Sequence, residues 1–294
     1  MSLYLHPDVT PATIAEAAAA GITNVKSYPA GVTTNSSAGV VDYAAFYPVF
    51  SAMESNNLIL NLHGELPPSA GKFKPSCCGN ADPEDITVMN AEAAFLPTLL
   101  DLHKKFPNLR IILEHCTTAA AISAVKSCGP TVAATITAHH LYLTIDAVVG
   151  NAYNFCKPVA KLPSDRLALL RAAVSRDPKF FFGTDSAPHP TSAKEKLGAP
   201  AAGCFTQKYA VQLVMDALEG AVEKGYIQES DVSAQVIEDF VGNFGRAFYG
   251  VSNPKGELII LSKRGEKVAD QETSDKVTLA NFRAGAETWS VDWK

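Results

Sequence analysis

The sequence lacks the features that mark secreted, membrane-bound or nucleic-acid-binding proteins. Its 294 residues carry a net charge of -5 and a pI of about 5.8, so no excess of positive charge favours nucleic acid or a membrane surface. The first residues, MSLYLHPDV, lack the basic start and apolar run of a secretory signal, and no run is long enough to span a membrane. We expect a cytoplasmic protein with no nucleic-acid or membrane partner.

The sequence also lacks a CxxC pair of cysteines. The six cysteines lie mostly inside apolar segments: Cys77, Cys78, Cys116, Cys128, Cys156 and Cys204. We expect buried free thiols rather than disulfides in a chain of this size. The neighbours Cys77 and Cys78 lie in a loop and could hold a metal, but nothing near them in the sequence supports this.

Short apolar runs alternate with amphipathic patterns from the N-terminus to about Gly220. The predicted strands are Leu3–Leu5, Thr23–Tyr28, Leu58–His63, Arg110–His115, Val132–Thr137 and Phe180–Thr184. The predicted helices are Pro11–Ala20, Tyr43–Ser55, Asn90–Lys105, Ala119–Cys128, Ser164–Ser175 and about Gln207–Lys224. Strands that are apolar on both faces and alternate with helices indicate an α/β protein with a buried parallel sheet.

The strand count bears on the architecture. A closed (β/α)8 barrel needs eight strands, and about six βα units are present, so the pattern predicts a TIM-barrel type fold that is incomplete at its N-terminal side. The competing architecture, an open doubly wound sheet, lacks support because no Gly-rich phosphate loop follows any strand. We expect one domain over residues 1–294, with the barrel core at about 1–220 and a helical C-terminal extension and tail at about 221–294.

Four predicted strands end in residues that suit a metal site. Lys26, His63, His115 and Asp185 each stand at or just after the carboxyl end of a strand, where the reactive groups of such barrels gather. Each has an ordinary alternative, since a lone histidine is more often a hydrogen-bonded surface or core residue and an Asp before Ser-Ala-Pro is often a turn former. Together, imidazole and carboxylate groups are a good ligand set for zinc.

Lys26 needs a separate explanation because an ammonium group repels a metal cation. One possibility is a salt bridge to a carboxylate. The other is that its amine, deprotonated by desolvation, has reacted with carbon dioxide to give a carbamate, an anion whose two oxygens can bridge two metal ions. The residues alone leave both open.

Several motifs in chain order resemble the dihydroorotase family of the amidohydrolase superfamily, in particular its shorter monofunctional enterobacterial and fungal type. They are Lys26-Ser27-Tyr28-Pro29, Thr33-Thr34-Asn35-Ser36-Ser37, His63-Gly64-Glu65, Glu114-His115-Cys116-Thr117-Thr118, Gly183-Thr184-Asp185-Ser186-Ala187-Pro188-His189 and Ala202-Gly203-Cys204-Phe205. The resemblance implies a (β/α)8 barrel with two zinc ions. It also implies reversible hydrolysis of L-dihydroorotate to N-carbamoyl-L-aspartate in pyrimidine synthesis, and a homodimer.

The resemblance implies roles for ten residues. Lys26 would be the carboxylated bridging lysine, His63 and His115 would bind one metal, and Asp185 would bind the other metal and shuttle the proton. His189 would contact the substrate carboxylate. Backbone groups at Ala202, Gly203 and Lys157 would bind the substrate, and Thr33 and Thr34 would lie on a loop that closes over it.

The sequence departs from the family pattern at its start. The His-x-His pair, the arginine and the asparagine that the family carries on its first strands are absent from residues 1–294, so the chain looks like a sequence that lacks its N-terminal portion. His6 is expected only to end a strand. His139 and His140 follow a strand, and neighbouring residues of a strand point to opposite faces, so we expect that they cannot easily share one ion.

These departures leave three interpretations. The chain is a dihydroorotase sequence without its first segment, a non-catalytic homologue that acts as a binding or regulatory subunit, or another cyclic-amide hydrolase. The missing ligands predict that one zinc ion or none is retained, and that carbamoyl aspartate cyclisation by the 294-residue chain is weak or absent.

Overall fold

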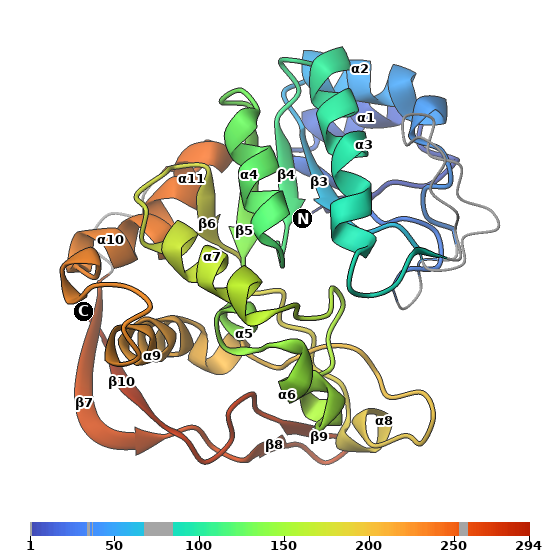
Figure 1. Ribbon diagram of the computed structural model, residues 1–294. Coiled ribbons are helices and arrows are strands. Elements are labelled where there is room, and N and C mark those ends of the chain that lie inside the picture. The colour runs from blue at the N-terminus through green and yellow to red at the C-terminus, as the bar shows by residue number, and fades with distance from the viewer. Residues whose placement is uncertain (1, 34–35, 37, 68–84, 253–257) are drawn as a thin grey trace. The chain divides into compact units, whose positions relative to one another are not determined.

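The computed structural model describes residues 2–33, 36, 38–67, 85–252 and 258–294 of the chain, shown in Figure 1. The described chain forms two compact units, residues 1–135 and 136–294. Thr34, Cys77 and Cys78 lie outside the described residues. No helix in the described ranges has both the length and the apolar character needed to cross a membrane.

Unit 1 alternates strands and helices as the sequence predicts. Its elements are β1 (Ser2–Tyr4), α1 (Pro11–Ala19), β2 (Asn24–Ser27), η1 (Tyr43–Phe46), α2 (Tyr47–Ser55), β3 (Ile59–His63), α3 (Ala91–Lys105), β4 (Ile111–Glu114), α4 (Ala119–Ser127) and β5 (Val132–Ile136). Each strand from β1 to β4 pairs in parallel with the next one along the chain. All five residues of β3 and of β5 are buried, which explains why these strands are visible in the sequence as apolar runs.

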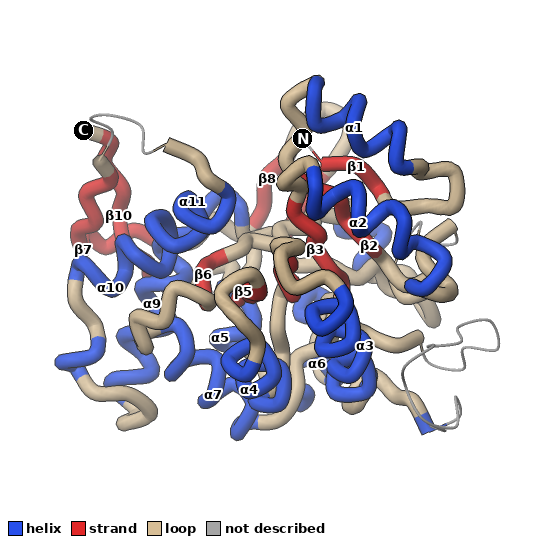
Figure 2. Tube along the Cα trace, turned by 90° about the horizontal axis from the view of Figure 1, so that it is seen from above, coloured by secondary structure: helices blue, strands red, loops and turns tan. Residues whose placement is uncertain are grey.

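Local signals fix the helices of unit 1. α1 begins at Thr10, whose side chain caps the helix and forms a reciprocal capping box with Thr13. The chain leaves α1 through Gly21 at φ +80°, the left-handed conformation that glycine adopts without strain. α1 then packs against α2, and Figure 2 shows the two helices side by side.

Unit 2 starts inside β5 and carries the remaining elements. They are α5 (Ala138–Tyr142), α6 (Ile145–Val149), η3 (Ala152–Asn154), α7 (Pro163–Ala173), β6 (Phe180–Phe182), α8 (Thr191–Lys194), η4 (Gln207–Tyr209), α9 (Ala210–Glu223), η5 (Glu229–Asp231), α10 (Ala234–Glu238), η6 (Asp239–Asn243), α11 (Phe244–Tyr249), β7 (Ile259–Lys267), β8 (Gln271–Thr273), β9 (Thr278–Ala280) and β10 (Glu287–Trp293). The carbonyl of Ile136 in β5 accepts a bond of 3.2 Å from Gly183, directly after β6. The sheet order follows the chain, β1-β2-β3-β4-β5-β6, so the predicted α/β class and all six predicted strands are confirmed.

The C-terminal tail differs from its prediction. The segment expected to be a helical extension contains α10 and α11, whereas the tail after it, for which no strands were predicted, contains two antiparallel pairs, β7 with β10 and β8 with β9. α9 packs against β10, and Figure 1 shows the helix beside these two strands. Most of β7 is exposed, so it lacks the apolar alternation by which a half-buried strand is predicted.

His139 and His140 also differ from their prediction. They follow β5, as predicted, but they lie in the short helix α5 and not in an extended segment, because Thr137 caps a helix there by accepting a bond from the backbone N–H of His140. On this helix their rings lie side by side, with centroids 4.4 Å apart. The prediction that His139 and His140 point to opposite faces of a strand was therefore wrong.

Candidate active site

In unit 1, two of the predicted ligands meet although 52 positions separate them in the sequence. His63 ends β3 and His115 follows β4, and the strand register pairs His63 with Glu114. His63 Nδ1 lies 3.1 Å from His115 Nε2, and both side chains are buried. His115 has φ +43°, an uncommon backbone conformation for a non-glycine residue and one that clusters at functional sites.

The spacing of the two nitrogens suits a shared metal ion. Two nitrogens bound to one tetrahedral zinc at about 2.0–2.1 Å lie about 3.3 Å apart, close to the 3.1 Å between His63 and His115. Glu65 Oε2 accepts a hydrogen bond of 2.9 Å from His63 Nε2, and Glu65 is buried. A carboxylate behind a histidine fixes the tautomer that leaves the other nitrogen as the ligand, which here is Nδ1. The residues of unit 1 therefore fit a zinc ion.

A ladder of polar side chains crosses four strands next to this pair. Asn24 donates to Asn61, Asn61 donates to Glu114 Oε1, and Thr135 donates to Glu114 Oε2 over 2.6 Å. The Thr135 hydroxyl oxygen also accepts a bond of 2.7 Å from the backbone N–H of His115. The ladder bonds the backbone of His115 to the sheet and so fixes the position from which the His115 side chain extends.

Lys26 lies beside the same cluster. It is half-buried on β2, its register partner on β3 is Asn61, and its Nζ lies 5.0 Å from the centre of the Tyr28 ring. The Tyr28 ring in turn lies 5.9 Å from the His63 ring. The Thr33 turn further along is held by Ser36, which donates to the Thr33 carbonyl over 2.7 Å.

In unit 2, the predicted residues Asp185, His189, Ala202 and Gly203 follow β6 in the chain, whereas Lys157 precedes it, in a segment whose Phe155 carbonyl accepts a bond of 2.8 Å from the Gly203 N–H. Asp185 is exposed and has φ +40°. His189 Nε2 donates to the Ala202 carbonyl over 3.0 Å, and the neighbouring Gly203 has φ +150°. A Cβ atom at Gly203 would lie 2.4 Å from the Ala187 carbonyl oxygen, so only glycine fits at this contact.

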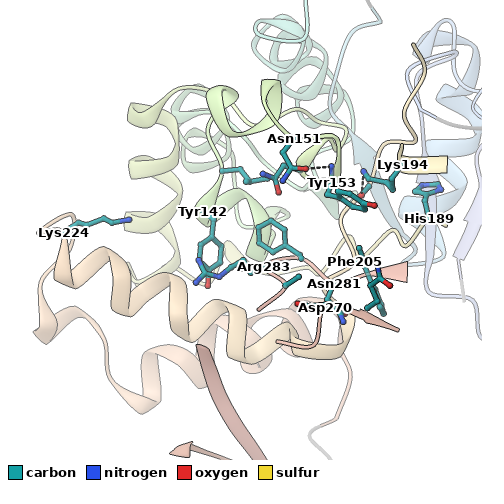
Figure 3. Close-up of a pocket in the computed structure, with 17 residues that line it drawn as sticks. Tyr142, Asn151, Tyr153, His189, Lys194, Phe205, Lys224, Asp270, Asn281 and Arg283 are labelled. Atoms are coloured by element: carbon teal, nitrogen blue, oxygen red, sulfur yellow. Dashed lines mark hydrogen bonds between the residues drawn. The ribbon is translucent and has the colours of Figure 1, made fainter. Parts of the chain in front are cut away.

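His189 also lines a pocket of about 630 Å³ that lies wholly within unit 2. Figure 3 shows His189, Lys194 and Tyr153 at one end of it and Tyr142 with Arg283 at the other. The Arg283 guanidinium lies 4.3 Å from the centre of the Tyr142 ring, close enough for a cation–π contact. Burial raises the pKa of the Tyr142 hydroxyl, so it stays neutral and donates to the Leu213 carbonyl.

A second group of possible ligands lies in unit 2, formed by His139, His140 and Cys156. One ligand atom of each lies within 4.8 Å of the others, and all three side chains are buried. His140 is engaged with Thr137 over 2.8 Å and with the Pro158 carbonyl over 3.0 Å. Hydrogen bonding to Cys204 and burial raise the pKa of the Cys156 thiol, which disfavours the thiolate form that binds metals.

Cys116, Cys128, Cys156 and Cys204 are free and buried, as predicted for these four. Two residues of interest had no role assigned from the sequence. Glu65 was recognisable only as part of the His63-Gly64-Glu65 motif, and its signal is the His-x-Glu spacing at a strand end. Lys194 carried no sequence signal.

Known proteins are similar to the chain over almost its whole length. No protein-family model matches the sequence. A probable dihydroorotase of Schizosaccharomyces pombe is 50% identical over 278 residues, covering 94% of this chain and 75% of the relative. The dihydroorotase of Saccharomyces cerevisiae is 47% identical over 311 residues, covering 100% of this chain and 80% of the relative.

Two solved structures are similar over almost the whole chain. The crystal structure of dihydroorotase in complex with 5-fluoroorotic acid from Saccharomyces cerevisiae has a TM-score of 0.87 at 45% identity, covering 100% of this chain and 80% of that one. Dihydroorotase from Campylobacter jejuni has a TM-score of 0.80 at 28% identity, covering 99% and 77%.

The fold and these likenesses define the chain first as a cyclic amidohydrolase of the TIM-barrel class. More narrowly, the chain belongs to the dihydroorotase family.

Proposed function

We propose that the protein catalyses the reversible hydrolysis of L-dihydroorotate to N-carbamoyl-L-aspartate in pyrimidine synthesis. The observation that carries the proposal is the buried pair of His63 and His115, with facing nitrogens 3.1 Å apart and Glu65 behind one of them, in a chain half identical to fungal dihydroorotases. No observation favours the interpretation as a regulatory subunit or the interpretation as another cyclic-amide hydrolase.

Four residues would hold zinc in this proposal. His63 would bind through Nδ1 and His115 through Nε2, while Asp185 and a carbamate on Lys26 would supply oxygen ligands. When bound, the metal would lower the pKa of a water molecule to near neutrality and polarise the amide carbonyl. Asp185 is included because the family resemblance implies this role for it.

The carbamate would form by attack of the neutral Lys26 amine on the carbon of carbon dioxide. A new N–C bond forms, one C=O bond becomes a C–O⁻ bond, and the nitrogen gives up one proton to solvent. A carbamate carbon signal in protein equilibrated with ¹³C-bicarbonate and zinc, absent from Lys26→Met, would support the assignment.

The other residues bind substrate and move the proton. Asp185 accepts the proton of the attacking water and delivers it to the leaving amide nitrogen, and in the synthetic direction it works in reverse. His189 and the backbone groups at Ala202, Gly203 and Lys157 orient the substrate. The family resemblance implies that Thr33 would help to close the site over the substrate and exclude water.

The test is turnover of L-dihydroorotate by purified zinc-loaded protein, compared with Asp185→Asn. We expect turnover that is weak, because residues 1–294 lack the His-x-His pair, and that is lost in Asp185→Asn. Hydantoin and dihydrouracil serve as comparison substrates. Turnover of either of these without turnover of dihydroorotate, or equal rates in wild type and Asp185→Asn, would contradict the proposal.

Location and assembly are secondary parts of the proposal. Kinship with a metabolic enzyme family supports a cytoplasmic enzyme that acts as a homodimer on a small-molecule substrate. Light scattering of the purified protein at several concentrations would measure the assembly state.

A further inference from the structure

Lys194 is a buried ammonium group held only by backbone carbonyls. It ends the short helix α8 and is 3% exposed. Its Nζ donates to the carbonyls of Phe155, Ala201 and Gly203 over 2.9, 2.9 and 2.8 Å. A protonated lysine has three N–H donors, so these carbonyls use all of them. No carboxylate lies within ion-pair distance of Lys194 in the described part of the chain.

The position is unfavourable for a charge, so the arrangement needs an explanation. Burial lowers the pKa of Lys194, with the nearby Cys204 and Cys156 acting in the opposite direction. A buried ammonium is tolerated where its donors are satisfied, and here the three carbonyls do this. A methionine or leucine would fill the same space without the cost of desolvation. The ammonium therefore serves a purpose other than filling the core.

The three carbonyls come from two separate segments that Lys194 ties together. The Phe155 carbonyl accepts from both Lys194 Nζ and the Gly203 N–H, the latter over 2.8 Å. The Ala201 N–H also bonds to the Ala193 carbonyl of α8 over 3.0 Å. The segment before Lys157 and the segment 201–203 thus meet at one ammonium group.

The groups at and next to these attachment points are those that the proposed function assigns to the substrate. Ala202 lies between the two clamped carbonyls of Ala201 and Gly203, and its own carbonyl receives the Nε2–H of His189. Lys157 is two residues beyond Phe155. A shift of either segment would move these backbone groups and the His189 ring together.

We propose that Lys194 is a positioning residue that sets the substrate-binding backbone at Lys157, Ala202 and Gly203 and, through Ala202, the orientation of His189. The inference rests on the proposed function. Its physical reason is that backbone groups cannot change rotamer to follow a ligand, so their usefulness depends on how well the segment that carries them is held. Lys194 touches no reacting atom and acts through the carbonyls alone.

The test compares Lys194→Met, which keeps the length of the side chain and removes the donors, with Lys196→Met, an exposed lysine two residues further on. The first measurement is the dissociation constant of 5-fluoroorotic acid, the compound bound in the yeast structure. We expect binding to weaken by about 10-fold or more in Lys194→Met, with zinc content unchanged, and to stay at the wild-type value in Lys196→Met. Lys194→Arg, which keeps a cation, should recover part of the affinity.

The second measurement is hydrogen exchange, which needs no catalysis. Amides of residues 153–158 and 199–206 should exchange faster in Lys194→Met, while those of β3 and β4 keep their protection. If Lys194→Met does not fold, Lys194→Arg carries the test through its affinity and exchange.

Three results separate the outcomes. Wild-type affinity in Lys194→Met would overturn the inference even if exchange rises, because Lys194 would then be only structural. Binding of 5-fluoroorotic acid by the wild type without turnover of dihydroorotate would overturn the proposed function and leave the Lys194 comparison valid. Absence of binding in the wild type would overturn both.

Discussion

Two pairs of histidines in this protein have opposite characters. His63 and His115 come from neighbouring strands of unit 1, face each other through ring nitrogens 3.1 Å apart, and have Glu65 behind one of them. His139 and His140 are adjacent in the sequence on α5 of unit 2. The rings of the second pair are close, but His140 is bonded to Thr137 and Pro158.

A metal site therefore depends on the direction of the ligand lone pairs and not on closeness in sequence. In the first pair, the bond to Glu65 consumes one nitrogen of His63 and leaves the other directed at His115. In the second pair, the Pro158 carbonyl can only accept a hydrogen bond, so His140 Nε2 carries a proton and donates it. His140 Nδ1 then accepts a hydrogen bond from the Thr137 hydroxyl. We therefore expect metal binding at the first pair and a structural role for the second.

The largest effect should follow removal of a ligand from the first pair. His115→Ala should weaken zinc binding by more than about 100-fold, since even the loss of a supporting partner costs 10–100-fold. Competition with a chelator of known affinity measures this. His140→Ala is the control and should keep wild-type affinity; an equal loss in both variants would show that the two pairs are not distinct.

Glu65→Gln should have the next largest effect. The amide can no longer stabilise the imidazole through a charged hydrogen bond, so zinc affinity should fall by about 10–100-fold, while the ligand set stays complete. The exposed Glu16→Gln on α1 is the matched control. Unchanged zinc affinity in Glu65→Gln would mean that Glu65 does not orient His63.

His140→Ala should lower the stability of the fold, although it leaves zinc binding intact. The variant removes the bonds of His140 to Thr137 and to the Pro158 carbonyl, which keeps only the weaker Cys156 thiol as a donor, and this should reduce the free energy of unfolding by about 1–3 kcal/mol. Urea denaturation of the zinc-free protein measures the change. A loss below about 0.5 kcal/mol would contradict a structural role.

The smallest effect should come from His139→Leu. His139 is fully buried, and neither ring nitrogen has a hydrogen-bond partner among the described residues. Replacing such a group by an apolar one is close to neutral or stabilising, so the free energy of unfolding at pH 8 should change by less than about 1 kcal/mol.

The same residue predicts a pH dependence. Burial, with smaller contributions from His140 and Lys194, lowers the pKa of His139 well below its ordinary 6.5. The unfolded chain therefore binds a proton that the folded chain does not, and stability is lost as pH falls below about 6.5. His139→Leu should lose less stability than the wild type between pH 7 and pH 5. Parallel losses in the two proteins would show that His139 does not contribute.

The parts of the fold that the sequence predicted are those buried on both faces. Strands such as Leu58–His63 are largely apolar runs. Because the carboxyl ends of neighbouring parallel strands meet, the sequence also correctly predicted that His63 and His115 lie close together. β7 to β10 were missed because Ile259–Lys267 is largely exposed and has no alternating pattern. α5 was missed although Thr137 is a good helix cap, because the apolar run of β5 leads directly into it.

The roles of Glu65 and Lys194 depend on contacts that sequence patterns do not contain. Glu65 bonds to His63, two residues before it, and the His-x-Glu spacing in the sequence is a signal for this contact. The role of Lys194 depends on hydrogen bonds to carbonyls 7, 9 and 39 positions away in the sequence. A surface helix end with a lysine looks the same in sequence as one whose lysine turns inward.

The most direct test of the account is the X-ray absorption spectrum of the zinc-loaded protein at the zinc edge. We predict a first shell of nitrogen and oxygen only, at about 2.0–2.1 Å, with the imidazole scattering of His63 and His115. A zinc–sulfur distance of about 2.3 Å would place the metal at Cys156 with the second histidine pair and contradict the account.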